Sequence, residues 1–215
     1  MKLNSLSENL KNFLNKRVIF RCDGGNVPEI GTGHIYRCLT IAKFLETKKI
    51  KKKNILFISK KKNNFSKGFN LIKSAGFKVY SPESNIKLEK KIEINTLNLF
   101  SSELLIIDRL DKIKKRELIK LKKKHKKIVL IDSMSRYIKD SDLYLNPHIK
   151  NKYTNKNFGL KYLILPGDKI KKTKKKEKKI FLYFGGYDNK NILKKTINIL
   201  SKINFNLKIC IEKKT

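Results

Sequence analysis

The chain has 215 residues, of which 40% are hydrophobic, so it can bury the core of one domain and part of another. Its formal net charge of +35 would normally indicate a nucleic-acid or anionic-surface partner. This charge comes mainly from lysines spread along the chain, in a composition that an AT-rich coding sequence produces. Arginine, which binds phosphate and guanine bidentately, is scarce, so we expect no nucleic-acid partner.

The cysteines and the apolar runs give expectations about the compartment. Cys22, Cys38 and Cys210 are odd in number and lack a paired ligand spacing, so they imply neither a zinc site nor a disulfide framework. The apolar stretches have only the length of strands, and no signal peptide is recognisable. We therefore expect a cytoplasmic protein with no membrane partner. The pattern leaves the oligomeric state open.

The first predicted elements surround a glycine-rich loop. Residues 1–16 have a helical pattern and form an N-terminal extension. A β-branched and aromatic run at 18–20 predicts a strand, and apolar residues recur at helical spacing from 35 to 42. Gly31 and Gly33, in the loop between them, can take positive φ and let another group approach the backbone. The unpaired N–H groups at the start of the helix favour an anion, such as a phosphate.

His34 and Arg37 follow this loop directly. The helix dipole disfavours a protonated ring at His34, which leaves the ring able to accept a proton. Arg37 lies three residues on, on the same helix face. The spacing fits neither the dinucleotide-binding fingerprint nor a P-loop, because the third glycine and the Gly-Lys-Ser/Thr sequence are missing. A generic turn followed by a packed or capping histidine is the alternative interpretation.

The pattern then alternates between strands and helices. Apolar runs predict strands at 54–58, 77–80, 104–108 and 128–132, and helices are predicted at 69–76 and in the lysine-rich stretch before 128. Apolar strands separated by helices are typical of a doubly wound parallel sheet in an α/β protein. Ligands bind beyond the carboxyl ends of such strands, where we expect Asp23, Asp108 and Asp132. A strand-end aspartate also commonly caps the next loop, which is the alternative role.

Residues 169–179 are almost wholly lysine and predict a solvated linker. We divide the chain into the extension (1–16), an N-terminal Rossmann-like catalytic domain (17–168), this linker, and an incomplete C-terminal nucleotide-binding domain (180–215). In that last part a strand at 180–184, a Gly-Gly turn, a helix through 193–200 and a strand at 206–211 begin a second βαβ unit. One crossover unit is too little to cover both faces of a sheet, so we expect the sequence to be truncated at its C-terminus.

The segment 30–39, Ile-Gly-Thr-Gly-His-Ile-Tyr-Arg-Cys-Leu, preceded by Arg21 and Asp23, resembles the signature of one family. These are the UDP-2,4-diacetamido-2,4,6-trideoxy-β-L-altropyranose hydrolases of pseudaminic acid synthesis, with the related spore-coat polysaccharide proteins. The strand ending in Asp108 is similar to another family segment, although Arg109 and Leu110 stand where the family has His-Tyr. Residues 185–191 resemble the family's Gly-Gly-Thr-Asp followed by Asn.

The resemblance implies a GT-B fold, in which two Rossmann-like halves face each other across a cleft. It gives His34 the role of general base, activating water that attacks the anomeric carbon of a UDP-sugar with inversion, without a cofactor or a metal. In keeping with this, His125 in the lysine-rich helix and His148 in a loop are expected to be solvent-exposed. By matching position, the substrate-binding residues are Arg21, Asp23, Gly31, Gly33, Arg37, Asp108, Gly185, Gly186, Asp188 and Asn191.

Two other functions remain open at this point. A GT-B glycosyltransferase would share the fold and the glycine-rich loops but pass the sugar to an acceptor instead of water. An inactive fragment, or a subunit completed by a partner chain, would share the ancestry without the activity. The Gly-Thr-Gly-His-Ile-Tyr-Arg run favours the hydrolase.

Overall fold

The computed structural model describes residues 16–25, 31–82, 89–109, 112–147, 157–165, 180–182, 191–202 and 207–209. The main element is a six-stranded, all-parallel sheet with the order β3-β2-β1-β4-β5-β6. Its strands are β1 (Lys16–Cys22), β2 (Ile55–Ile58), β3 (Lys78–Tyr80), β4 (Ser102–Asp108), β5 (His125–Ile131) and β6 (Leu143–Leu145). The prediction of a doubly wound parallel α/β sheet is therefore confirmed.

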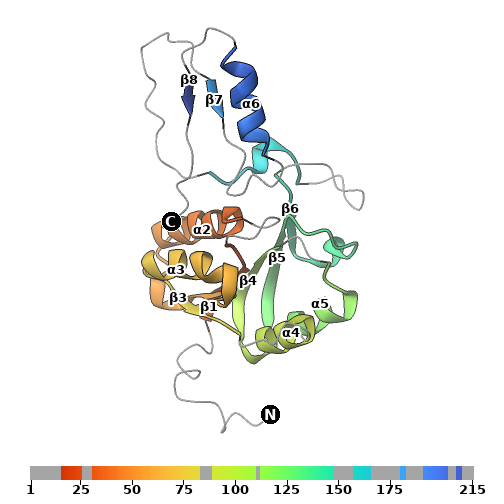
Figure 1. Cartoon of the computed structure of the whole chain (residues 1–215). Coiled ribbons are helices and arrows are strands. Elements are labelled where there is room, and N and C mark those ends of the chain that lie inside the picture. Colours follow the sequence, from red (N-terminus) through yellow and green to blue (C-terminus); the bar gives the residue numbers. More distant parts are fainter. Residues whose placement is uncertain are drawn as a thin grey trace.

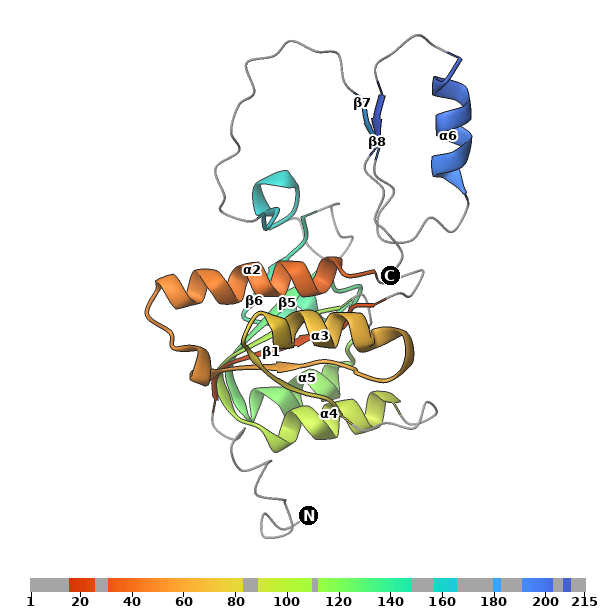
Figure 2. The ribbon, with the colours of Figure 1, turned by 60° about the vertical axis from the view of Figure 1, so that its left-hand side comes forward.

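Helices cover both faces of this sheet. They are α2 (Gly33–Thr47), α3 (Ser66–Ser74), α4 (Glu89–Leu99) and α5 (Lys115–Lys122), with short 3-10 turns η2 (Lys52–Asn54), η3 (Asn63–Phe65), η5 (Ile138–Asp140) and η6 (Leu160–Tyr162). Figures 1 and 2 show α2 and α3 on one face and α4 and α5 on the other. The described part thus has the three layers of a Rossmann-like fold.

Two apolar cores lie on the two faces of the sheet. Along β1, Ile19 packs with residues of the α4–α5 layer such as Leu118, whereas Phe20 packs with the α2–α3 layer, including Ile35 and Ile72. All four residues of β2 are buried. A central strand covered on both faces needs apolar side chains at every position, which explains the continuous runs in the sequence.

His125 corrects one expectation. It is not an exposed residue of the lysine-rich helix but the first residue of β5, and it is buried. Its Nδ1 lies 2.8 Å from the Ser102 hydroxyl, and its Nε2 lies 3.3 Å from the carbonyl oxygen of Leu97. Burial, with the nearby charge of Lys124, lowers the pKa of His125 to about 4, although the hydrogen bond to Leu97 opposes this. The other histidine assigned to solvent, His148, lies outside the described residues.

The later part of the chain forms a second, small parallel sheet. It contains β7 (Ile180–Leu182) and β8 (Leu207–Ile209), and α6 (Ile192–Leu200) lies between them in the sequence. The predicted βαβ order is confirmed for these residues. The N-terminal extension, up to residue 15, and the lysine-rich linker lie outside the described residues. Within the described segments, no helix combines the length and the apolar character needed to cross a membrane.

Candidate active site

The candidate site lies where the strand order reverses. From β1 the chain winds outward through β2 and β3 on one side, and then crosses to β4 on the other side of β1. The carboxyl ends of β1 and β4 are therefore neighbours, and Cys22 pairs in register with Asp108. Helix α2 begins at this edge. In open parallel sheets the crevice at such a reversal is the usual ligand site.

His34 and Asp108 contact each other directly at this edge. The Nδ1 atom of His34 lies 2.7 Å from Oδ1 of Asp108. Asp108 is completely buried, and the His34 side chain is 10% exposed. Among the described residues, His34 Nε2 has no hydrogen-bond partner. The ring is thus held at one nitrogen by a buried carboxylate and reaches solvent with little of its surface.

Arg37 surrounds the same carboxylate. Its Nε donates to Asp108 Oδ2 at 2.7 Å and its Nη2 to Asp108 Oδ1 at 2.5 Å, so the ion pair is bidentate. Nη2 also lies 3.4 Å from Asp132 Oδ2 and 3.0 Å from His34 Nδ1. Burial by itself would lower the pKa of Arg37, but the hydrogen bonds and charges of Asp108 and Asp132 raise it. Arg37 is fully charged at any physiological pH.

These contacts differ from the role predicted for Arg37. The resemblance implies that Arg37 binds substrate, whereas its guanidinium is occupied by two carboxylates and the side chain is 11% exposed. Its position instead orients Asp108, and through Asp108 the ring of His34. Asp132, expected at the same sheet edge, is the second carboxylate that holds the guanidinium in place.

Cys38 is a neighbour that the sequence did not predict. Its Sγ lies 3.7 Å from Asp108 Oδ2, one turn beyond His34 on α2. Burial raises the pKa of this thiol well above its usual range, and the nearby Cys22 and Asp108 act in the same direction. The thiol is therefore protonated and serves as a weak donor to the carboxylate. Cys38 follows His34 by four residues in α2, and this spacing, which puts both on one helix face, was the signal in the sequence that they lie close together.

Arg21 and Asp23 form a second ion pair beside the first. Arg21 Nη1 and Nη2 donate to the two oxygens of Asp23 at 2.6 and 2.8 Å, the Lys60 N–H donates at 2.9 Å, and Arg109 lies 3.7 Å away. Arg21 is 0% and Asp23 3% exposed. Burial would raise the pKa of Asp23, but Arg21, Arg109 and the Lys60 amide together hold it well below its usual range.

This pair also departs from the sequence-based expectation. Arg21 and Asp23 were predicted to bind substrate, but Arg21 is completely buried and cannot touch a ligand. Arg21 lies in β1 and Asp23 comes directly after the last residue of that strand, so only two positions separate the side chains that pair. Arg109, which directly follows β4, adds its charge to Asp23. The cluster fixes the carboxyl ends of β1 and β4 against each other.

The glycine-rich loop is shaped by two different demands. Gly31 has φ +53°, a left-handed conformation, and its carbonyl accepts from the Gly25 N–H at 2.8 Å, which closes the loop. Gly33 does not take positive φ; it begins α2, and a Cβ there would meet no atom of the described residues within 4 Å. A Cβ on Gly25 would lie 1.9 Å from the Asn64 carbonyl oxygen. Gly25 is therefore required by packing, whereas Gly33 leaves open space.

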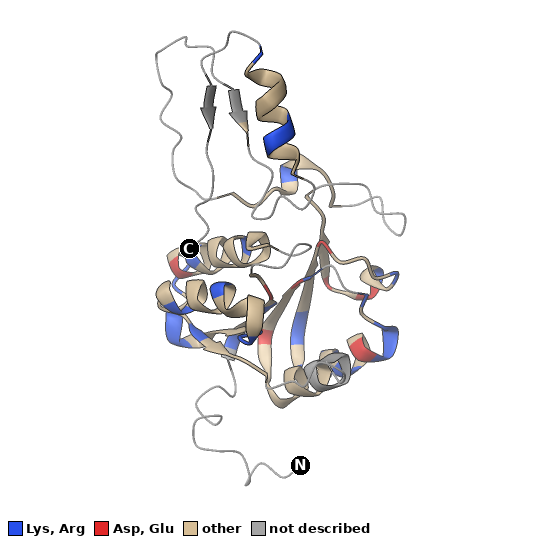
Figure 3. Cartoon of the chain, viewed as in Figure 1, with Lys and Arg blue, Asp and Glu red and all other residues tan. Residues whose placement is uncertain are grey.

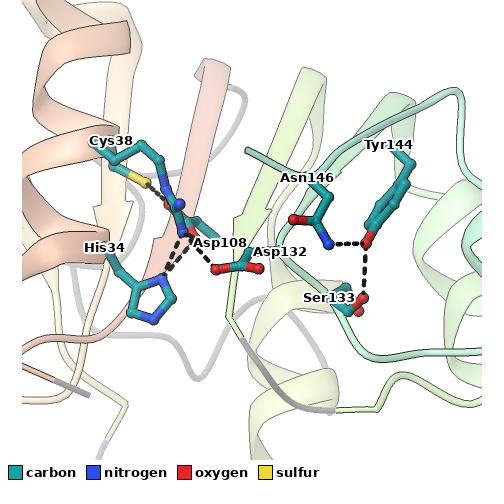
Figure 4. A network of polar contacts seen from close by, with 8 residues as sticks. His34, Cys38, Asp108, Asp132, Ser133, Tyr144 and Asn146 are labelled. Atoms are coloured by element: carbon teal, nitrogen blue, oxygen red, sulfur yellow. Dashed lines mark hydrogen bonds and ion pairs between the residues drawn. The ribbon is translucent and has the colours of Figure 1, made fainter. Parts of the chain in front are cut away.

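A cluster of three polar residues lies beside the ion pairs. Tyr144 Oη donates to the Ser133 carbonyl at 3.3 Å and accepts from the Asn146 amide at 3.1 Å. Figure 4 shows this cluster next to Asp132, with His34 and Cys38 on the other side of Asp108. Asp132 itself has φ +56° and donates its N–H to the Leu145 carbonyl. The cluster fixes the end of β5 and the aspartate that follows it.

Of the site residues predicted in the C-terminal half, only Asn191 is described. It is exposed, has φ +51° and precedes α6. Gly185, Gly186 and Asp188 lie outside the described residues. Among the residues that the structure describes, no group of three or more His, Cys, Asp or Glu side chains is arranged to hold a metal ion.

Comparisons with known proteins add no identity to this geometry. No family model matches the chain. No curated protein sequence matches it either. What the site can do chemically therefore follows from its own groups: a histidine oriented by a buried carboxylate, an arginine that holds this carboxylate, and a glycine-rich helix start beside them.

Proposed function

We propose that this chain hydrolyses a UDP-linked 2,4-diacetamido-2,4,6-trideoxy sugar, with His34 as the general base. The observation that carries the proposal is the 2.7 Å contact between His34 Nδ1 and the buried Asp108, at the sheet edge where doubly wound folds bind ligands. The signature in which His34 lies supports the substrate class. A base held by a buried carboxylate suits reactions in which water must lose a proton as it attacks.

The proposed chemistry depends on which ring nitrogen carries the proton. Nδ1 is closer to Asp108 (2.7 Å) than to Arg37 Nη2 (3.0 Å), and Nη2 already donates to Asp108. We therefore assign the proton to Nδ1, from which it is donated to Asp108 Oδ1. The lone pair then lies on Nε2, the nitrogen without a partner among the described residues. This is the atom that accepts the proton of water.

In the proposed step, water oxygen forms a bond to the anomeric carbon while the bond from that carbon to the diphosphate oxygen breaks. His34 Nε2 takes the water proton, and UDP leaves with the electron pair of the broken bond. The imidazolium that forms is stabilised by the negative charge of Asp108. Arg37 holds this carboxylate in its position beside the ring through the bidentate ion pair.

The backbone of the loop and helix start would act on the leaving group. The first N–H groups of α2 have no partner within the helix, and the helix dipole favours negative charge at this end. The open space above Gly33 allows a phosphate oxygen to come close to the backbone. Because Arg21 and Arg37 are both occupied by carboxylates, the backbone is the donor that this edge offers to the diphosphate.

The test is UDP release from the diacetamido UDP-sugar, with the product followed by NMR. We expect release with inversion at the anomeric carbon, and a loss of 10²- to 10⁴-fold in kcat for His34→Gln. His125→Gln is the matched control, since it removes a buried histidine that lies away from the site. Full release by His34→Gln would exclude the proposed base. Release only in the presence of a sugar acceptor would favour the glycosyltransferase.

A further inference from the structure

A separate cavity lies between the loops that follow β4 and β5. Its volume is about 740 Å³, and it is lined by residues 112–116 and 134–137. Both loops leave the carboxyl edge of the sheet, and the lining residues lie at the start of α5 and before η5. Cavities of this size are typical of small-molecule sites. None of the residues proposed to act in hydrolysis lines it.

The cavity lining is strongly cationic. Its charged members are Lys112, Lys114, Lys115, Arg116 and Arg136, and none of the described lining residues is acidic. Within the described residues none of these five side chains has an ion-pair partner. Glu117, which follows Arg116 in the sequence, accepts a hydrogen bond from the Lys114 backbone N–H at 2.8 Å. Five like charges around one hollow repel each other, so an anion would relieve this repulsion.

Hydrogen bonds fix the walls of the cavity. The Ser135 hydroxyl donates to the carbonyl of Ile113 at 2.6 Å and accepts from the Tyr137 N–H at 3.1 Å. Both Ser135 and Ile113 are buried, so this contact ties together the two loops that line the cavity. The Arg136 guanidinium lies 4.9 Å from the centre of the Tyr137 ring. The hollow is therefore part of the folded structure.

Arginine usage distinguishes this cavity from the general basic surface. Lysines occur throughout the chain, and Figure 3 shows basic residues on many elements, so lysine alone marks no site. The sequence has 47 lysines but only six arginines. Three of the six, Arg21, Arg37 and Arg109, bind carboxylates in the candidate active site. Two more line this cavity, which leaves only Arg17 elsewhere.

This distribution indicates the kind of ligand. In a composition that replaces arginine with lysine almost everywhere, arginine remains where its planar, bidentate donors are needed. At the active site these positions contact carboxylates. Phosphate oxygens are the other common bidentate partner of a guanidinium. We infer that the cavity between the β4 and β5 loops binds a phosphate-bearing small molecule, with Arg116 and Arg136 as its bidentate donors and the three lysines as additional charge.

The experiment is isothermal titration of the full chain with inorganic pyrophosphate, UDP and uridine. We expect pyrophosphate and UDP to bind and uridine not to bind. The double variant Arg116→Gln/Arg136→Gln should weaken pyrophosphate binding at least 10-fold. Lys120→Gln/Lys123→Gln removes the same charge from the far end of α5, outside the cavity lining, and should change binding less than 2-fold. All four substituted residues are exposed, so both variants should fold.

The outcomes separate this site from the proposed hydrolase. An equal loss of pyrophosphate affinity in the two double variants would show that general charge, not the cavity, attracts the anion, and would overturn the inference. A wild-type chain that binds no pyrophosphate would overturn it as well. UDP binding no tighter than pyrophosphate would identify the diphosphate group alone as the ligand, whereas tighter UDP binding would add the nucleoside. His34→Gln should retain pyrophosphate binding at this cavity even if UDP release is abolished or was never present.

Discussion

Asp108 is the carboxylate on which His34 depends: 74 positions apart in the sequence, the two residues meet through a 2.7 Å contact between Oδ1 and Nδ1. Arg37 binds both oxygens of the same carboxylate from one turn further along α2. The single buried side chain of Asp108, at the end of β4, therefore positions two residues of α2. Each contact has a measurable consequence.

Asp108→Asn should impair UDP release more than it impairs substrate binding. An amide cannot stabilise the imidazolium that forms on His34, so we expect kcat to fall about 10²-fold or more while KM changes little. The variant leaves the partly buried Arg37 without its main counter-charge, which costs about 3 kcal/mol of unfolding free energy. Steady-state kinetics measure kcat and KM, and urea unfolding measures the unfolding free energy.

The control for stability is Asp142→Asn, which removes a partly exposed ion pair with Lys127 and should cost less than about 1 kcal/mol. An unchanged pH–rate profile in Asp108→Asn would contradict the proposed dependence of His34 on Asp108.

Asp23 should make the protein sensitive to acid. Its pKa in the folded chain is held well below its usual range by Arg21. Between that value and the unfolded pKa of about 3.9, the unfolded chain binds the extra proton, so the stabilisation is complete above about pH 4 and is lost as the pH falls further. Asp23→Asn should cost about 3–5 kcal/mol at pH 7.

Urea unfolding of wild type and Asp23→Asn between pH 3 and pH 7 measures this effect. The gap between the two unfolding free energies should narrow below pH 4. A constant gap down to pH 3 would show that the carboxylate is not stabilised by Arg21.

His125 should produce a second pH dependence at a higher range. Its pKa is about 4 in the folded chain, against about 6.5 in an unfolded chain. Between these values the unfolded state binds more protons, so stability is complete above about pH 6.5 and falls on the order of 3 kcal/mol as the pH drops to 4. His125→Gln should be less stable than wild type at pH 7 but should show a flatter profile between pH 6.5 and pH 4. Parallel profiles in the two proteins would refute the buried neutral state.

Two glycines of the loop region should respond in opposite ways to alanine. Gly25→Ala places a Cβ 1.9 Å from the Asn64 carbonyl oxygen, so the backbone must shift and we expect a loss of about 1–3 kcal/mol or more. Gly33→Ala has no atom within 4 Å of the new Cβ and lies in α2, so stability should stay the same or rise by up to about 1 kcal/mol.

Thermal unfolding of Gly25→Ala and Gly33→Ala measures this contrast. If a phosphate approaches the backbone at Gly33, the second variant should also raise KM for the UDP-sugar. A stable Gly33→Ala protein with unchanged KM would place the diphosphate elsewhere.

The sequence predicted the central strands because their burial leaves a clear pattern. β1, β2, β4 and β5 are buried on both faces, and continuous apolar runs mark them. β6, with only three residues at the sheet edge, and α4, with weak helical periodicity, were not predicted as elements. The start of β5 was also missed, because two consecutive exposed lysines, Lys126 and Lys127, follow His125 and resemble the preceding lysine-rich helix.

The sequence predicted the location of the site better than its contacts. Strand-end aspartates in a parallel sheet must share an edge, so Asp23, Asp108 and Asp132 were expected together with the start of α2. Which cation binds which carboxylate depends on side-chain directions across three strands, and motif matching carries no such information. Arg21 and Arg37 were therefore assigned to substrate, although both are occupied by neighbouring carboxylates. The two-residue spacing of Arg21 and Asp23, at the end of β1, was the signal for their pairing.

The pairing of β1 with β4 also determines when, during synthesis of the chain, the contact between His34 and Asp108 can form. β2, β3 and helices α2 to α4 are synthesised between His34 and Asp108, so a growing chain that has not yet reached Asp108 holds the histidine, the loop and the helix without the carboxylate that orients the ring. Pairing across so many intervening residues forms late, because its loop-closure entropy has to be offset first. Nascent and partly folded molecules therefore lack the oriented histidine until β4 docks beside β1.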